Sequence, residues 1–166
     1  MIALNTPHDD GHAPSPNFAS ASEDAAIART ALRRMDAEGL MARGCVVMIR
    51  FERLRERLGE RCWGHVRGKV RALVEQRLER RRRMGREGVW ISETELVLAV
   101  PADNIDIIQG ASMRMLMCVY GGIQMGWSSA DVDVRLVTEL RGDEIACVRL
   151  DPTAIVRGDP AAFVLD

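Results

Sequence analysis

Apolar residues follow two spacings along this chain, one typical of helices and the other typical of strands. Helical spacing marks about residues 22–39, a segment that starts around Gly64 and runs to about Arg83, and about residues 102–119. A short helix, "ERLRERLGE", is predicted just after the first strand. Short apolar runs, continuous or alternating, predict strands at "CVVMIRF", "GVWI", "ELVLAV", "VDVRLVTEL" and "EIACVRL".

Turn-forming residues separate these elements and fix their order. Gly85 and Gly88 end the arginine-rich helix, and Ser92-Glu93-Thr94 joins two strands as a tight turn. Arg141-Gly142-Asp143 stands between the last two strands, where a hairpin turn is expected. The order strand, helix, hairpin, helix, hairpin predicts the α/β class, as an α+β sandwich whose antiparallel-rich central sheet is flanked by helices.

The same pattern divides the chain into one folded domain and its flanking segments. Residues 1–21 are polar and lack periodicity, so they are predicted to form a disordered tail. An N-terminal helix is expected within 22–43, the folded domain within 44–151, and a C-terminal tail at 152–166. No apolar run approaches about 20 residues and no secretory signal is evident, so we expect a cytoplasmic protein without membrane insertion.

The net charge of −1 conceals an uneven distribution of charge. Between Arg53 and Glu87 there are 13 Arg or Lys and 5 Asp or Glu residues, a balance of +8, and Lys69 is the only lysine. The favoured interpretation is a solvated helix face that pairs with Glu75, Glu79 and an acidic partner. Binding of nucleic acid or of an anionic surface is the alternative.

Four cysteines are scattered along the chain without a close pair: Cys45, Cys62, Cys118 and Cys147. Those at 45, 118 and 147 lie in apolar runs, which is typical of buried thiols. Neither disulfides nor a zinc site is expected, because Cys62 and His65 have no second pair of ligands nearby. We therefore expect no metal and no cofactor.

Three segments between residues 46 and 101 carry motifs in a defined order. "VVMIRFERL" holds Arg50-Phe51-Glu52-Arg53-Leu54, "WGHVRGK" holds Gly64, His65 and Gly68, and "VWISETELVLAVP" holds Ser92-Glu93-Thr94-Glu95-Leu96. In this order they resemble the GGDEF domain of diguanylate cyclases, which join two GTP molecules into cyclic di-GMP. That family has Asp-x-Asp-x-Phe, a Gly-His-x-x-Gly-Asp turn and Gly-Gly-Asp-Glu-Phe at these places. The resemblance implies a nucleotide-cyclase-like fold.

The departures from the family pattern imply that catalysis has been lost. A cyclase needs two carboxylates that hold Mg²⁺ against the triphosphate. The matching positions here are Arg50 and Thr94, and a guanidinium repels a cation. The paired glycines, which let the backbone approach the nucleotide, are replaced by Ser and Glu, although Glu52 and Glu95 remain. We therefore expect no diguanylate cyclase activity.

The resemblance also implies a candidate ligand site. The family's inhibitory cyclic di-GMP site is an Arg-x-x-Asp stretch shortly before the signature, and Arg83 and Arg86 occupy the outer positions of this stretch here. Two arginines can clamp a phosphate, and the alternative is a solvated end of the arginine-rich helix. Gly64, His65 and Gly68 are further candidates for ligand or anion binding, against the alternative that His65 is a helix-start or core histidine.

Arg141-Gly142-Asp143-Glu144-Ile145 spells the same signature with one Gly missing, but it stands in the wrong place. Only about 20 residues follow it, whereas roughly half of the family's domain follows the signature. Its residues are expected to form a hairpin turn whose polar side chains hydrogen-bond locally and stay exposed to solvent.

From these residues we expect a catalytically inactive GGDEF-like domain that acts in bacterial signalling as a regulatory protein-interaction module. Its contact surfaces are expected on the first helix and on the arginine-rich helix. The partner is expected to be another protein, a second copy of the chain included. One alternative is a sensor of cyclic di-GMP or another nucleotide through Arg83 and Arg86. Another is nucleic-acid or acidic-surface binding by the arginine-rich helix.

Overall fold

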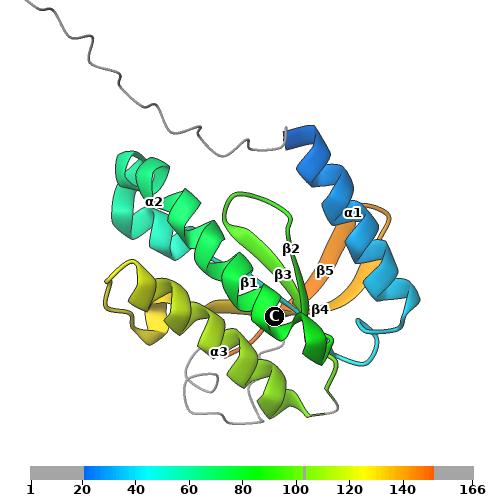
Figure 1. Cartoon of the computed structure of the whole chain (residues 1–166). Helices are drawn as coiled ribbons and strands as arrows, with labels where there is room; N and C mark the ends of the chain where they lie inside the picture. Colours follow the sequence, from blue (N-terminus) through cyan, green and yellow to red (C-terminus); the bar gives the residue numbers. More distant parts are fainter. Residues whose placement is uncertain (1–20, 103, 152–166) are drawn as a thin grey trace, which may run out of the picture.

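The computed structural model describes residues 21–102 and 104–151. Apart from Ala21, the tails predicted at 1–21 and 152–166 lie outside the described residues. Figure 1 shows the helices and strands of the described chain. In order they are α1 (Ala21–Ala37), β1 (Val46–Arg50), α2 (Glu52–Arg81), the 3₁₀ turn η1 (Arg82–Met84), β2 (Glu87–Trp90), β3 (Glu95–Ala99), α3 (Ile105–Gly122), the 3₁₀ turn η2 (Ser129–Asp131), β4 (Asp133–Arg141) and β5 (Glu144–Arg149).

The strands form one antiparallel sheet in the order β2-β3-β1-β4-β5. The helix α2 connects β1 to β2, and β3 lies between these two strands in the sheet. The strand β4 lies on the other side of β1. This is the split βαβ arrangement, to which β5 is added through a hairpin with β4. The predicted α+β class, with an antiparallel sheet flanked by helices, is confirmed.

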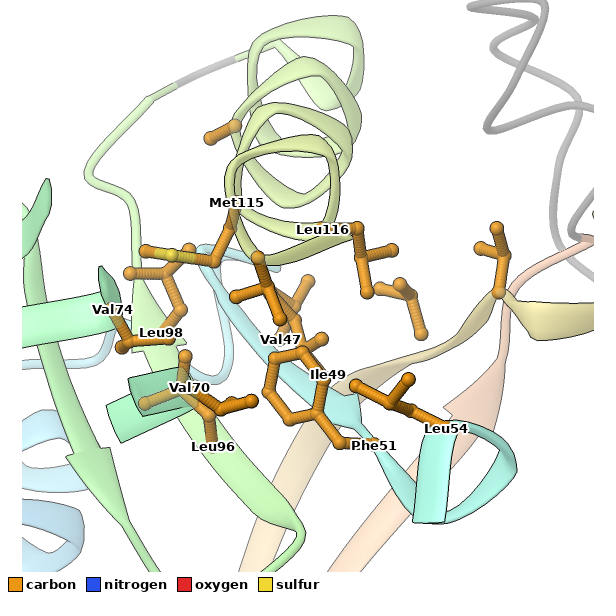
Figure 2. Close-up of a cluster of buried hydrophobic side chains, with 14 of the residues drawn as sticks. Val47, Ile49, Phe51, Leu54, Val70, Val74, Leu96, Leu98, Met115 and Leu116 are labelled. Carbon is orange, nitrogen blue, oxygen red and sulfur yellow. The ribbon is translucent and has the colours of Figure 1, made fainter. Parts of the chain in front are cut away.

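The larger hydrophobic core lies between the sheet and the two helices α2 and α3 (Figure 1). Side chains of a strand alternate between the two faces of the sheet, so every second residue of β1 and β3 points into this core. Figure 2 shows where side chains of these strands meet those of the helices, among them Val47, Ile49, Leu96, Leu98, Val70, Val74, Met115 and Leu116. Burial of apolar surface holds both helices on this face.

The opposite face of the sheet is covered by α1 (Figure 1). The intervening strand residues Val46, Met48 and Val97 share a second buried cluster with Leu32 and Met35 of α1. The domain is therefore a sandwich of three layers, with α1 on one side of the sheet and the pair α2 and α3 on the other.

The course of α2 corrects a boundary predicted from the sequence. The helix has one break, at Gly59, whose φ of 73° and ψ of 158° are not helical. The short helix predicted after β1 ends there, but the second helix begins directly afterwards and not around Gly64 and Gly68. The Gly-His-x-x-Gly stretch is therefore helical and forms no turn. Burial of Trp63 on the inner face offsets the cost of about 1 kcal/mol for each glycine inside a helix.

The hairpin between β4 and β5 has the turn predicted for it. Arg141 pairs with Glu144, and Gly142 in the turn has a φ of 65°. Glycine adopts this left-handed conformation without strain. Asp143 stays exposed, and its carboxylate lies 3.0 Å from the guanidinium of Arg29 on α1. The signature-like string is thus a turn, as expected, and its acidic residue contacts α1.

The four cysteines are free thiols, as the sequence predicted. Their burial differs from the expectation in part, since Cys45 is buried, Cys118 and Cys147 are only partly buried, and Cys62 is exposed. The reason is position: Cys45 precedes the central strand β1, whereas Cys147 lies on β5 at the edge of the sheet.

Asp131 ties the start of β4 to α2. Its side chain is 6% exposed and accepts hydrogen bonds from the Ser128 N–H and from Arg57 Nη1, both at 2.7 Å. Burial alone would raise the pKa of Asp131, but the hydrogen bonds from Arg57 and Ser128 outweigh burial and hold the pKa below its ordinary value of 3.8. The carboxylate therefore stabilises the fold in its charged form.

We expect Asp131 to make the stability of the domain depend on pH in the acid range. Because its pKa is lower in the folded state, its contribution is fully present above about pH 4 and is lost as the pH falls through the folded pKa. Asp131→Asn is expected to flatten this part of the profile in urea unfolding between about pH 3 and pH 7. An unchanged acid limb in the variant would contradict this role.

Candidate functional site

The turn between β2 and β3 lies beside the end of β1. Arg50, the last residue of β1, pairs with Glu95 in the register of β1 and β3. One residue further on, the Phe51 N–H donates a hydrogen bond to the carbonyl oxygen of Thr94 at 2.7 Å. The fold therefore brings Arg50 next to residues 92–96, the segment that the sequence comparison placed on the family signature.

Arg50 lies between two carboxylates on the strands that flank β1. Its Nε donates to Glu95 Oε1 on β3 at 2.8 Å, and its Nη1 donates to Asp133 Oδ2 on β4 at 3.4 Å. The side chains of Arg50, Glu95 and Asp133 are 28%, 25% and 14% exposed. A guanidinium only donates hydrogen bonds, so this cluster already contains its own cation.

The remaining polar residues of the turn are also engaged. Thr94 is 6% exposed, and its hydroxyl donates to Glu52 Oε2 at 3.0 Å. The Ser92 hydroxyl donates to the second carboxylate oxygen of Glu95 at 3.3 Å. Glu93 is exposed and forms an ion pair with Arg67 of α2. Each acid in and beside the turn is thus held by a partner within the protein.

Asp133 is a residue of this site that sequence reasoning missed. Besides Arg50 it contacts Arg135, whose Nε lies 3.2 Å from Asp133 Oδ1. Burial lowers the pKa of Arg135, but the hydrogen bonds and charges of Asp133 and Cys147 together outweigh burial and raise the pKa overall. The signal in the sequence was an acidic residue opening an alternating apolar strand, where a polar side chain at the sheet end is common.

The carboxylates at the end of β1 lie beside a guanidinium of the same chain. Three carboxylates, those of Glu52, Glu95 and Asp133, lie around the end of β1, but the guanidinium of Arg50 stands between two of them. Within residues 21–102 and 104–151, no group of three or more His, Cys, Asp or Glu side chains is arranged to hold a metal ion. No helix of the described chain is both long enough and apolar enough to cross a lipid bilayer.

The predicted site residues Gly64, His65 and Gly68 lie within α2 and not in a turn. Gly64 and His65 are exposed, and Gly68 is partly buried. A Cβ atom at Gly64 or Gly68 would meet no atom within 4 Å, so close packing does not require glycine at either position. The two glycines therefore carry no evidence of a backbone approach to a ligand.

Arg83 and Arg86, which the sequence predicted to act as a pair, lie in different environments. Arg83 is exposed at the end of η1, whereas Arg86 is partly buried just before β2. The charged groups that act on Arg86 are Arg114, Arg81 and Arg77. Arg114, in the middle of α3, was missed by sequence reasoning, although a single basic residue in a largely apolar helix was a signal for it.

The chain matches no protein-family model, no curated protein and no solved structure. The resemblance to a GGDEF domain expected from the sequence therefore rests on the sequence motifs alone. The split βαβ order and the contact of Arg50 with the β2–β3 turn are the structural features on which a functional proposal can stand.

Proposed function

We propose that this chain is a catalytically inactive GGDEF-like domain that regulates bacterial signalling by binding another protein. The observation that carries the proposal is the pair of contacts from Arg50 to Glu95 and Asp133. Arg50 stands at the position where the family pattern has a metal-binding carboxylate. The second such position is Thr94, a neutral side chain whose hydroxyl is bound to Glu52.

The charges of the cluster support loss of catalysis. Joining two nucleoside triphosphates requires divalent cations that bridge carboxylates and phosphates and that offset the developing charge. A cation that approached Glu95 or Asp133 would meet the positive charge of Arg50 at close range. In this proposal the guanidinium of Arg50 occupies the place that a metal ion would need in order to take part in the cyclase reaction.

The exposed surfaces of α1 and α2 support a role in protein binding. Ile27 on α1 is a large apolar side chain that is 56% exposed, so it is available for contact with another protein. Arg61 and Arg80 are exposed on α2. An acidic protein partner with an apolar contact residue fits these two surfaces.

The catalytic part of the proposal is tested by incubating the purified chain with GTP and Mg²⁺ or Mn²⁺. We expect no cyclic di-GMP above the level of a buffer control, while an active diguanylate cyclase assayed in parallel gives product. Formation of cyclic di-GMP that disappears in Glu95→Gln would contradict the proposal, because it would show that the cluster still supports metal-dependent chemistry.

The partner-binding part is tested by placing a photo-crosslinking amino acid at Ile27 or Arg80 in the cells that produce the protein. We expect a discrete adduct with one protein at either position, a second copy of the chain included. Met117, which is 51% exposed on α3, provides the matched control position and is expected to give no adduct. Adducts at Met117 alone would contradict the assigned surfaces.

A further inference from the structure

A recess between the second half of α2 and the middle of α3 is surrounded by arginines. Its apolar floor is formed by residues of α2, β3 and α3, and four guanidinium-bearing side chains line it: Arg77, Arg81, Arg86 and Arg114. They come from two helices and from the segment before β2. The fold therefore brings together arginines that are not all close in sequence. The recess lies away from Arg50 and its carboxylates.

Three arginines of this recess, Arg77, Arg86 and Arg114, differ from several other arginines of the domain because they form no ion pair within the described residues. Arg50, Arg57 and Arg71 each contact a carboxylate. Among the ion pairs of the described residues, none includes Arg77, Arg86 or Arg114. None of these three guanidinium groups therefore forms an ion pair with a carboxylate of the described residues.

Burial and mutual repulsion act on Arg86 in particular. Burial and the positive charges of Arg114, Arg81 and Arg77 together lower the pKa of Arg86. The partial negative charge at the carboxyl end of α2 favours cations in the last turn, where Arg81 lies. It does not account for Arg114, which projects from the middle of α3. The cluster thus carries unfavourable repulsion that a bound anion would relieve.

Gly110 helps to place Arg114 in this recess. The two terminal nitrogens of Arg114 would lie 3.2 Å and 3.6 Å from a Cβ atom built on Gly110, one helical turn earlier. The guanidinium therefore lies back along α3 against a residue without a side chain. The absence of a side chain at Gly110 leaves room for this flat group, which is exposed and can donate two parallel hydrogen bonds to an oxyanion.

We infer that this recess binds a phosphate group with two or more negative charges, such as pyrophosphate or a phosphomonoester, through Arg77, Arg86 and Arg114. Guanidinium groups bind phosphate oxygens in pairs, and several of them together match a multiply charged group. The charged groups that act on Arg86 in this recess are all positive. This favours a multiply charged phosphate over the singly charged phosphodiesters of cyclic di-GMP. The inference does not rest on the proposed loss of catalysis.

The test is calorimetric titration of the full chain with pyrophosphate at low ionic strength, beside a parallel titration with cyclic di-GMP. We expect saturable binding of pyrophosphate that is tighter than binding of cyclic di-GMP. Arg86→Gln and Arg114→Gln are each expected to weaken the affinity by about tenfold or more. Arg80→Gln is the matched control, because Arg80 is exposed on α2 outside the lining of the recess and its loss removes the same charge.

Thermal unfolding provides a second measurement on the same variants. Pyrophosphate is expected to raise the unfolding midpoint of the wild type and of Arg80→Gln, and to leave that of Arg114→Gln unchanged. If Arg86→Gln does not fold, Arg114→Gln alone decides the question. Absence of pyrophosphate binding, tighter binding of cyclic di-GMP, or an equal loss of affinity in Arg80→Gln would each overturn the inference.

Discussion

Replacing Trp63 with alanine is expected to lower the free energy of unfolding by about 3–5 kcal/mol, the largest effect of any single change considered for this fold. Trp63 is 2% exposed and belongs to the core between α2 and the sheet. Its indole N–H has no hydrogen-bond partner among the described residues, so the loss arises from packing and from the cavity left behind. Urea unfolding followed by circular dichroism measures it.

His65, two positions along α2, provides the control for this prediction. Its side chain is exposed, so His65→Ala is expected to change the free energy of unfolding by less than about 0.5 kcal/mol. The pair of variants distinguishes a helix with one buried face from a turn built around the Gly-His-x-x-Gly stretch. Equal losses at both positions would contradict the packing described for α2.

The order of elements could be predicted because the two spacings of apolar residues are distinct in this chain. The run that became β1 is continuous and β-branched, and its residues are mostly buried. The run that became β4 alternates in sequence, but its burial is irregular and its pairing with β5 shifts register between Val137 and Glu139. The boundary inside α2 could not be predicted in the same way. Gly59, Gly64 and Gly68 look alike in sequence, and only the structure shows that Gly59 is the one that interrupts the helix.

The candidate site could be predicted in part, for a similar reason. The contact between Arg50 and residues 92–96 follows from aligning two local motifs and pairing their strands. Asp133 lies 83 positions from Arg50 in sequence and Arg114 lies on a different helix from Arg86, so no local pattern links them. Long-range neighbours of this kind depend on the strand order and on helix packing, which a single sequence does not reveal.

Arg50→Asp is expected to have the second large effect, because Arg50 is the cation of the carboxylate cluster. The change places a third carboxylate beside Glu95 and Asp133 and removes the charge that offsets them. In the presence of a chelator the variant is expected to lose about 3 kcal/mol of stability, since unpaired and partly buried charges are left behind. Three neighbouring carboxylates are also ligands of the kind that divalent cations prefer.

Divalent cations are therefore expected to recover much of the stability lost in Arg50→Asp. Arg61→Asp is the matched control, because it makes the same change of charge at an exposed position of α2. A metal response in that control as large as in Arg50→Asp would show that added acidity alone attracts the ion.

The central claim, that Arg50 takes the place of a metal ion in an inactive cyclase-like site, is tested most directly by the unfolding midpoint with and without Mn²⁺. The account predicts no shift for the wild type and a clear rise for Arg50→Asp. A rise for the wild type, or none for a folded Arg50→Asp variant, would contradict the account.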